Sequence, residues 1–142
     1  MSDPDIRLLL DESILGFKKV FRDKPGYDVL TCLEAGHPRG TKDAILIESA
    51  FADHRFFLTN DFDTITPELY PPCKRASILR LPRNKISREY VFERVNAIQF
   101  LRLAHRAVTH FTFLEDDKIE VVTHNETIER KFTEYEETKH IT

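Results

Sequence analysis

The chain of 142 residues has the length of one ordinary domain and is long enough to bury a hydrophobic core. Its hydrophobic fraction of 41% and charged fraction of 32% are typical of a globular rather than a disordered protein. The net charge of −3 excludes a protein coated with positive charge for binding nucleic acid, but it is compatible with a nuclease that carries a local basic cluster.

The sequence indicates neither a membrane span nor a secretion signal. No apolar run approaches the roughly 18–20 residues that cross a bilayer. The first five residues contain two aspartates and no basic residue, whereas a signal peptide begins with basic residues. Cys32 and Cys73 lie far apart and lack the spacing of a zinc or redox motif. We therefore expect a cytoplasmic protein with two reduced thiols and no membrane contact.

The first 81 residues alternate between predicted strands and helices. Apolar or β-rich runs predict strands at residues 6–10, 27–32, 56–59 and 76–81. Helical spacing of apolar side chains at residues 15–21 predicts a helix that ends at Lys24, Pro25 and Gly26. Thr41 is a favourable N-cap for a second helix that ends near Asp53. This alternation predicts right-handed βαβ units and an α/β fold with a parallel sheet.

The second half of the chain predicts one long helix and a hairpin. Ser87 is expected to cap the helix, whose apolar face begins at Val91. Residues 110–114 and 118–124 predict two strands joined by a short turn. The polar tail from about residue 126 has helical composition and predicts a surface helix or a partner-binding segment. Because there is no internal repeat or linker, residues 1–142 are predicted to form a single domain.

Acidic residues directly follow two of the predicted strands. Asp11 and Glu12 follow the first strand, and Asp61 and Asp63 follow the third. Parallel strands end at the same edge of a sheet, and ligands of open α/β sheets bind outside this edge. We therefore expect these carboxylates to converge.

Gathered carboxylates repel one another and raise each other's pKa values, unless a cation neutralises them. Oxygen ligands suit Mg²⁺ or Mn²⁺, and either metal can activate water for phosphodiester hydrolysis. The sequence contains no convincing HExxH, P-loop, G-x-S-x-G or zinc pattern that would indicate a different chemistry. The acids therefore predict a divalent metal site.

Most of these acids also have a purely structural explanation. Asp61 and Asp63 are residue types that turns favour, and Asp43 would suit a helix start through the helix dipole. We expect strand–helix topology alone to place Asp43 at the edge of the sheet opposite to Asp11. The loop at residues 34–40 is nevertheless long enough to bring Asp43 to the same edge. Asp11 is the hardest to explain in this way, because it directly follows a buried strand.

Four short segments resemble, in their order and spacing, the DUF5615 family of PIN-like proteins. They are residues 8–13 (LLLDES), 26–29 (GYDV), 42–46 (KDAIL) and 57–63 (FLTNDFD). Residues 78–81 (ILRL) also resemble the family's fourth strand, which often ends in arginine. The resemblance covers about the first 80 residues well. It implies a three-layer PIN-like α/β fold with a mostly parallel central sheet, and a small bacterial protein similar to the toxins of toxin–antitoxin pairs.

The resemblance also implies a set of site residues. Asp11, Asp43, Asp61 and Asp63 would be the catalytic acids and would bind Mg²⁺ or Mn²⁺, with Asp11 as the central ligand. The sequence departs from the family at Ser13, where asparagine is usual, and after Asp63, where an aromatic residue is common. It has no clear match to a further acid of better-known PIN toxins, for which Glu34 is the candidate.

An RNA substrate would require cations to hold its phosphates. Arg80 is the best candidate because it ends the fourth predicted strand, and Lys42 and Arg39 lie beside or before Asp43. Each of them also suits an ordinary charged surface. Further basic residues that could extend this rim are Lys74, Arg75, Arg83 and Lys85.

The leading prediction is a metal-dependent endoribonuclease of PIN-like type, with an antitoxin or a second copy of the chain as the partner that the resemblance implies. The alternative is a PIN-like protein-interaction module whose acids do not support catalysis. A phospho-receiver domain is a weaker candidate. Its required Ser or Thr and its Lys are replaced by Pro82 and Glu115.

Overall fold

The computed structural model describes residues 6–61, 65–66, 68–69, 78–82, 87–100, 111–114, 118–122 and 127–131. In chain order its elements are β1 (Ile6–Leu10), a 3-10 helix η1 (Glu12–Phe17), α1 (Lys18–Phe21), β2 (Tyr27–Thr31), α2 (Asp43–Ala52), β3 (Phe56–Thr59), β4 (Ile78–Arg80), α3 (Arg88–Phe100), β5 (Phe111–Leu114), β6 (Lys118–Val122) and β7 (Thr127–Lys131). No helix in this described part of the chain is long and apolar enough to cross a membrane.

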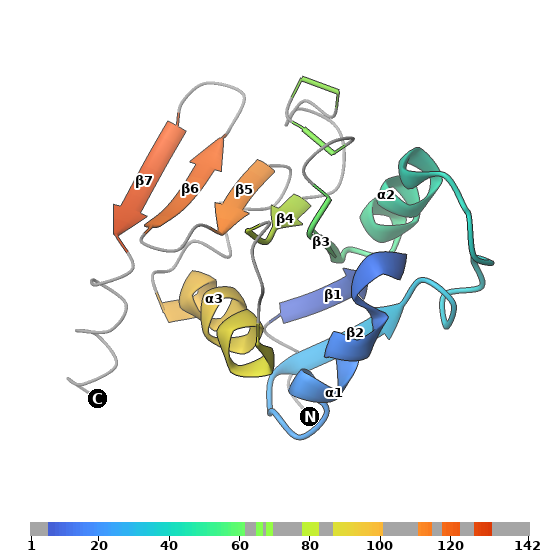
Figure 1. The fold of residues 1–142 in the computed structure, drawn as a ribbon, viewed down its shortest axis with the longest axis horizontal. Helices are drawn as coiled ribbons and strands as arrows, with labels where there is room; N and C mark the ends of the chain where they lie inside the picture. The colour runs from blue at the N-terminus through green and yellow to red at the C-terminus, as the bar shows by residue number, and fades with distance from the viewer. Residues whose placement is uncertain are drawn as a thin grey trace.

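All of these strands join one sheet in the order β2-β1-β3-β4-β5-β6-β7 (Figure 1). Strands β2, β1, β3, β4 and β5 run parallel, and β6 and β7 are antiparallel to their neighbours. The predicted α/β class with a mostly parallel central sheet is therefore confirmed. From β1 the chain adds β2 on one side and then crosses to β3 on the other, so the strand order reverses between β1 and β3.

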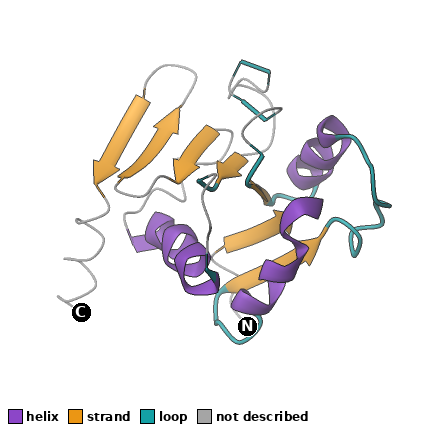
Figure 2. Cartoon of the chain, in the orientation of Figure 1, coloured by secondary structure: helices purple, strands orange, loops and turns teal. Residues whose placement is uncertain are grey.

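Helices cover both faces of the sheet and make three layers (Figure 2). Successive side chains of a strand point to opposite faces. Leu8 and Leu10 accordingly pack with Phe21 of α1 and with the apolar face of α3, whereas Leu9 packs with Leu46 of α2. Because both of its faces are covered, β1 is apolar at nearly every position, as is usual for a central parallel strand.

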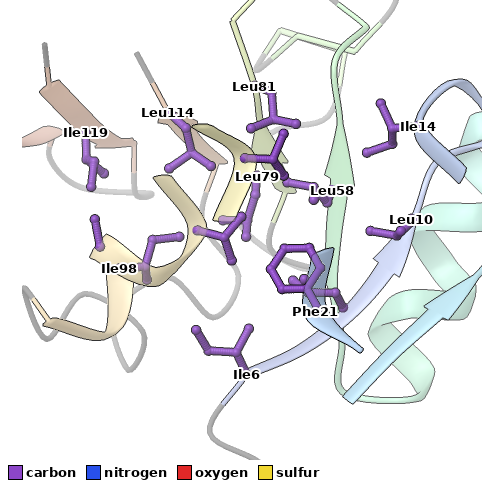
Figure 3. Packing of buried hydrophobic residues seen from close by; sticks show 14 of the residues in the cluster. Ile6, Leu10, Ile14, Phe21, Leu58, Leu79, Leu81, Ile98, Leu114 and Ile119 are labelled. Carbon is purple, nitrogen blue, oxygen red and sulfur yellow. The ribbon is translucent and has the colours of Figure 1, made fainter. Parts of the chain in front are cut away.

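The larger core cluster lies between the sheet and the α1–α3 layer. Leu10, Leu58 and Leu79 come from the adjacent strands β1, β3 and β4, and they belong to the same cluster as Ile98 of α3 and Phe21 of α1 (Figure 3). Each of these side chains is at most 2% exposed. This packing fixes the relative positions of the strands, and with them the edge at which β1 and β3 end.

The two predicted helices on this face differ in regularity. The helix expected at residues 15–21 is instead the 3-10 helix η1 followed by the single turn α1, and Ile14 has non-helical angles of φ −129° and ψ 28°. The long helix begins as predicted, because the N–H of Tyr90 donates to Ser87 Oγ at 3.1 Å. This bond satisfies one of the N–H groups that a helix start leaves without a partner.

The predicted N-cap of the second helix is wrong. Lys42 holds the cap position of α2 and makes no side-chain cap bond. The hydroxyl of Thr41 instead donates to the carbonyl oxygen of Pro38 at 2.6 Å. The hydroxyl therefore closes the preceding turn, which competes with capping for the same short side chain.

The predicted helical tail is also wrong where the structure describes it. Residues 127–131 form β7, which pairs antiparallel with β6. Ile128 packs against the larger core cluster, while its neighbours in β7 are exposed. Strand β6 offers an open row of main-chain groups, and this pairing overrides the helical composition of the segment. Residues 132–142 lie outside the described part.

Candidate functional site

Asp11 lies at the carboxyl end of β1, where the strand order reverses. Its main-chain N–H donates to the carbonyl oxygen of Leu58 in β3 at 3.0 Å. This bond extends the β1–β3 pairing one residue beyond β1, and the Asp11 residue is only 6% exposed. Open α/β sheets bind their ligands in the crevice at such a reversal. Asp11 is therefore held rigidly at the position that the sheet topology favours for a site.

Two hydrogen bonds fix the carboxylate of Asp11. Its Oδ1 accepts from the N–H of Glu12 at 2.7 Å, and its Oδ2 accepts from the hydroxyl of Thr59 at 2.7 Å. Thr59 Oγ1 in turn accepts from the N–H of Asp61 at 3.1 Å. This connected set joins the ends of β1 and β3. It orients the buried carboxylate through Thr59, whose side chain is fully buried.

The Asp11 carboxyl group is easier to protonate than an ordinary aspartate. Burial raises the pKa of Asp11, and the negative charges of Asp61 and Glu12 raise it further. The hydrogen bonds from Thr59 and Glu12 lower the pKa, but by less. Asp61 is linked to Asp11 through Thr59, which accepts from the Asp61 N–H and donates to the Asp11 carboxylate. Keeping Asp11 charged in the metal-free protein therefore costs free energy, and a bound cation would remove that cost.

We expect the Asp11→Asn variant to gain stability, relative to wild type, as the pH rises. Because the folded-state pKa of Asp11 is raised, the penalty for its charge is absent below its ordinary pKa and complete above the raised one. The variant lacks this penalty. Its free energy of unfolding should therefore increase relative to that of the wild type between about pH 4 and about pH 7. Urea unfolding with a chelator present measures both proteins at both pH values. A difference that does not change with pH would contradict the prediction.

Asp43 lies in the first turn of α2. A helix that connects two parallel strands begins at the edge where the first strand ends, so the expectation that topology places Asp43 at the opposite edge is wrong. The N–H of Gly40 donates to Glu12 Oε2 at 3.0 Å. The loop before α2 therefore lies beside the residue that follows Asp11. Asp63 lies outside the described residues.

Within the described ranges, no group of three or more His, Cys, Asp and Glu side chains is placed to hold a metal ion. The described ranges include Asp11, Asp43 and Asp61 but not Asp63. The structure nevertheless links Asp61 to Asp11 through Thr59. It also places Asp43, in the first turn of α2, on the same edge of the sheet.

The three predicted RNA-binding cations have different surroundings. Lys42 is exposed beside Asp43. The Arg39 side chain is 71% exposed, and its Nη1 lies 3.8 Å from Glu12 Oε1. Arg80 is only partly exposed, and its Nη1 donates to the carbonyl oxygen of Ile65 at 3.2 Å. Arg80 therefore also anchors the segment that follows β3. The predicted basic rim at Lys74, Arg75, Arg83 and Lys85 lies outside the described residues.

Glu34, the candidate for the further acid, serves the turn after β2. Its Oε1 accepts from the N–H of Thr31 at 2.9 Å, and its Oε2 pairs with the ammonium group of Lys18. The bond from Lys18 is the main cause that lowers the pKa of Glu34. Both carboxylate oxygens are thus engaged in local structure.

Three polar residues of the site were missed by the sequence reasoning. Thr59 positions Asp11, and the hydroxyl of Ser13 donates to Asn60 Oδ1 at 2.8 Å, which links η1 to the end of β3. In the sequence, only their position could have identified Thr59 and Asn60 as site residues, because they stand directly before Asp61 at the end of a predicted strand. A hydroxyl on a strand end is too common to be singled out without the register of the neighbouring strand.

The arrangement offers hard oxygen donors at a rigid, partly buried edge of the sheet. Each carboxylate oxygen of Asp11 accepts one hydrogen bond and has a second lone pair for a cation. Such donors suit Mg²⁺ or Mn²⁺ better than softer metals. Comparison of the chain with protein-family models, with curated proteins and with solved structures finds no match.

Proposed function

We propose that the chain is a metal-dependent endoribonuclease of PIN-like type that acts in the cytoplasm as the toxin of a toxin–antitoxin pair. The observation that carries the proposal is the buried carboxylate of Asp11, with its raised pKa and with Asp61 nearby, at the reversal of strand order. A protein gains nothing in stability from an acid in such a place, so a ligand is the best reason for it. The resemblance of segments 8–13, 26–29, 42–46 and 57–63 to PIN-like proteins supports the same function.

The oxygen donors at this edge are of the type that Mg²⁺ or Mn²⁺ prefers, which supports either ion as the metal of the proposed site. Asp11 and Asp61 would provide the first oxygen ligands, and Asp43 and Asp63 would complete the set. When bound, the metal would supply a water of lowered pKa and would stabilise negative charge on the phosphate. Thr59 keeps the Asp11 carboxylate in one orientation through its hydrogen bond to Oδ2.

Binding of the RNA backbone is assigned to Arg39, Lys42 and Arg80. Arg39 and Lys42 lie on the loop that Glu12 ties to the site, and Arg80 ends β4 beside Thr59 of β3. Arginine and lysine at this edge would hold phosphates without reading the base sequence. An antitoxin, or a second copy of the chain, would block the same edge.

Titration of the wild-type protein with Mn²⁺ by calorimetry tests the proposal directly. We expect saturable binding, together with cleavage of a labelled single-stranded RNA that requires Mn²⁺ or Mg²⁺ and stops when a chelator is added. Absence of binding would contradict the metal site. Binding without cleavage would favour the alternative, a PIN-like interaction module that has kept its acids and lost catalysis.

A further inference from the structure

Strand β2 forms one end of the sheet and pairs only with β1 in the described part of the chain (Figure 1). The Ile6 N–H donates to Gly26 O at 3.0 Å, and the Cys32 N–H donates to Leu10 O at 3.2 Å. Alternate residues of a strand direct their main-chain groups to the same side. Residues 26, 28, 30 and 32 therefore face β1, and the main-chain groups of residues 27, 29 and 31 point away from the sheet.

One end of this row is already occupied. The Thr31 N–H donates to Glu34 Oε1 at 2.9 Å, and Thr31 O accepts from the Ala35 N–H at 3.0 Å. The N–H and C=O of Val29 have no such partner among the residues that the structure describes. The stretch available for pairing therefore centres on Val29.

A hollow of about 450 Å³ lies along this stretch, between α1 and β2. Its lining residues are Lys18, Phe21, Arg22, Tyr27, Asp28 and Val29. The rings of Phe21 and Tyr27 lie 5.1 Å apart, centre to centre, and provide an apolar surface. The hollow thus has room for side chains next to main-chain groups that can accept a strand.

The α1 side of the hollow is basic, although the whole chain carries a net charge of −3. Four cations fall within seven residues, with Asp23 the one acid among them: Lys18, Lys19, Arg22 and Lys24. Lys18 is paired with Glu34, whereas Arg22 is exposed and lines the hollow. Asp28, the acid in the lining, is already paired with Arg55 at 3.1 Å. The charge available to a ligand is therefore positive.

We propose that the β2 edge binds an extended, acidic segment of a partner protein as an added strand. The main chain of the segment would pair at Val29, its apolar side chains would enter the hollow, and its carboxylates would lie against Arg22. RNA lacks the peptide N–H and C=O groups that pair with a β-strand. A second copy of this chain would bring two basic α1 helices together across a two-fold axis, and their like charges would repel. This inference does not depend on whether the chain cleaves RNA.

Fluorescence anisotropy with a labelled peptide that alternates glutamate and valine tests the proposal. We expect saturable binding to the wild-type protein, and a loss of about tenfold or more in affinity for the Arg22→Glu variant. Val29→Pro removes an outward N–H that β1 does not use, so it should also weaken binding while thermal unfolding shows that the fold is kept. Lys19→Glu is the matched control. It makes the same charge change on α1 outside the hollow and should have little effect.

Four results would overturn the proposal. The first is no binding of the glutamate–valine peptide to the wild type, and the second is an equal loss of affinity in Lys19→Glu and Arg22→Glu. The third is displacement of the peptide by a single-stranded RNA oligonucleotide, with the same dependence on Arg22, which would assign the hollow to nucleic acid. Sedimentation velocity that shows a dimer broken by Val29→Pro would assign the edge to a second copy instead.

Discussion

Replacing Asp11 with asparagine is expected to abolish Mn²⁺ binding and to lower the rate of RNA cleavage by more than about 100-fold. The amide has nearly the same shape but no negative charge, and Asp11 is the buried acid that Thr59 connects to Asp61. Calorimetry with Mn²⁺ and single-turnover cleavage of a labelled RNA, both at about pH 7, measure the two effects.

Two further variants make this result specific. Asp23→Asn changes an exposed aspartate that lies after α1, so it should leave metal binding and cleavage unchanged. Thr59→Val has the same shape as the wild-type residue but cannot donate to Asp11 Oδ2, and it should give an intermediate loss because the carboxylate is present but less well oriented. Cleavage that persists in Asp11→Asn would rule out Asp11 as the central ligand.

Replacing Arg55 with alanine is expected to destabilise the protein by about 3 kcal/mol. Arg55 is 7% exposed. Its guanidinium donates to the carbonyl oxygens of Leu8 and Asp28 at 3.3 and 3.0 Å, to Asp28 Oδ1 at 3.1 Å, and to Asp53 Oδ2 at 2.5 Å. Removal of the side chain leaves two main-chain carbonyls and the Asp28 carboxylate without this partner. Chemical unfolding of the two proteins at equal pH gives the difference.

Arg7→Ala is the control for this prediction. Arg7 pairs with Asp53 at 3.2 Å, but both side chains are at least one-third exposed. Exposed ion pairs typically contribute less than about 1 kcal/mol. We therefore expect Arg7→Ala to cost much less than Arg55→Ala. An equal loss in the free energy of unfolding for the two variants would show that burial of the guanidinium does not increase the contribution of its contacts to stability.

Charged side chains at the amino ends of the strands and at their carboxyl ends are arranged in opposite ways. At the amino edge, Asp28 and Asp53 are neutralised by Arg55 and Arg7. At the carboxyl edge, the pKa of Asp11 is raised because burial and neighbouring acids outweigh its hydrogen bonds. Asp28 belongs to the segment GYDV, which supports the PIN-like resemblance, and its contacts are those of a structural residue. The unbalanced acids at the other edge are what favour a cation there.

The sequence alone was sufficient for the α/β class and for most strands, for a physical reason. Ile6–Leu10 and Phe56–Thr59 are covered on both faces, so nearly every residue in them is apolar and the runs are visible without any contact information. The cap at Ser87 was also predictable, because it depends only on neighbours within one turn. The tail was not, since β7 exists only because the edge of β6 accepts it.

For the candidate site, the sequence by itself determined that acids follow the first and third strands, and parallel pairing then requires them to share one edge. Only the tertiary structure decided how Asp11 is held. Its bond to Thr59 depends on the register of β1 against β3, and the contact of Glu12 with Gly40 joins residues 28 positions apart. Local sequence fixes which strands and turns are favoured. Contacts between distant segments depend on how those elements pack, and that packing sets the geometry and the charge balance of the site.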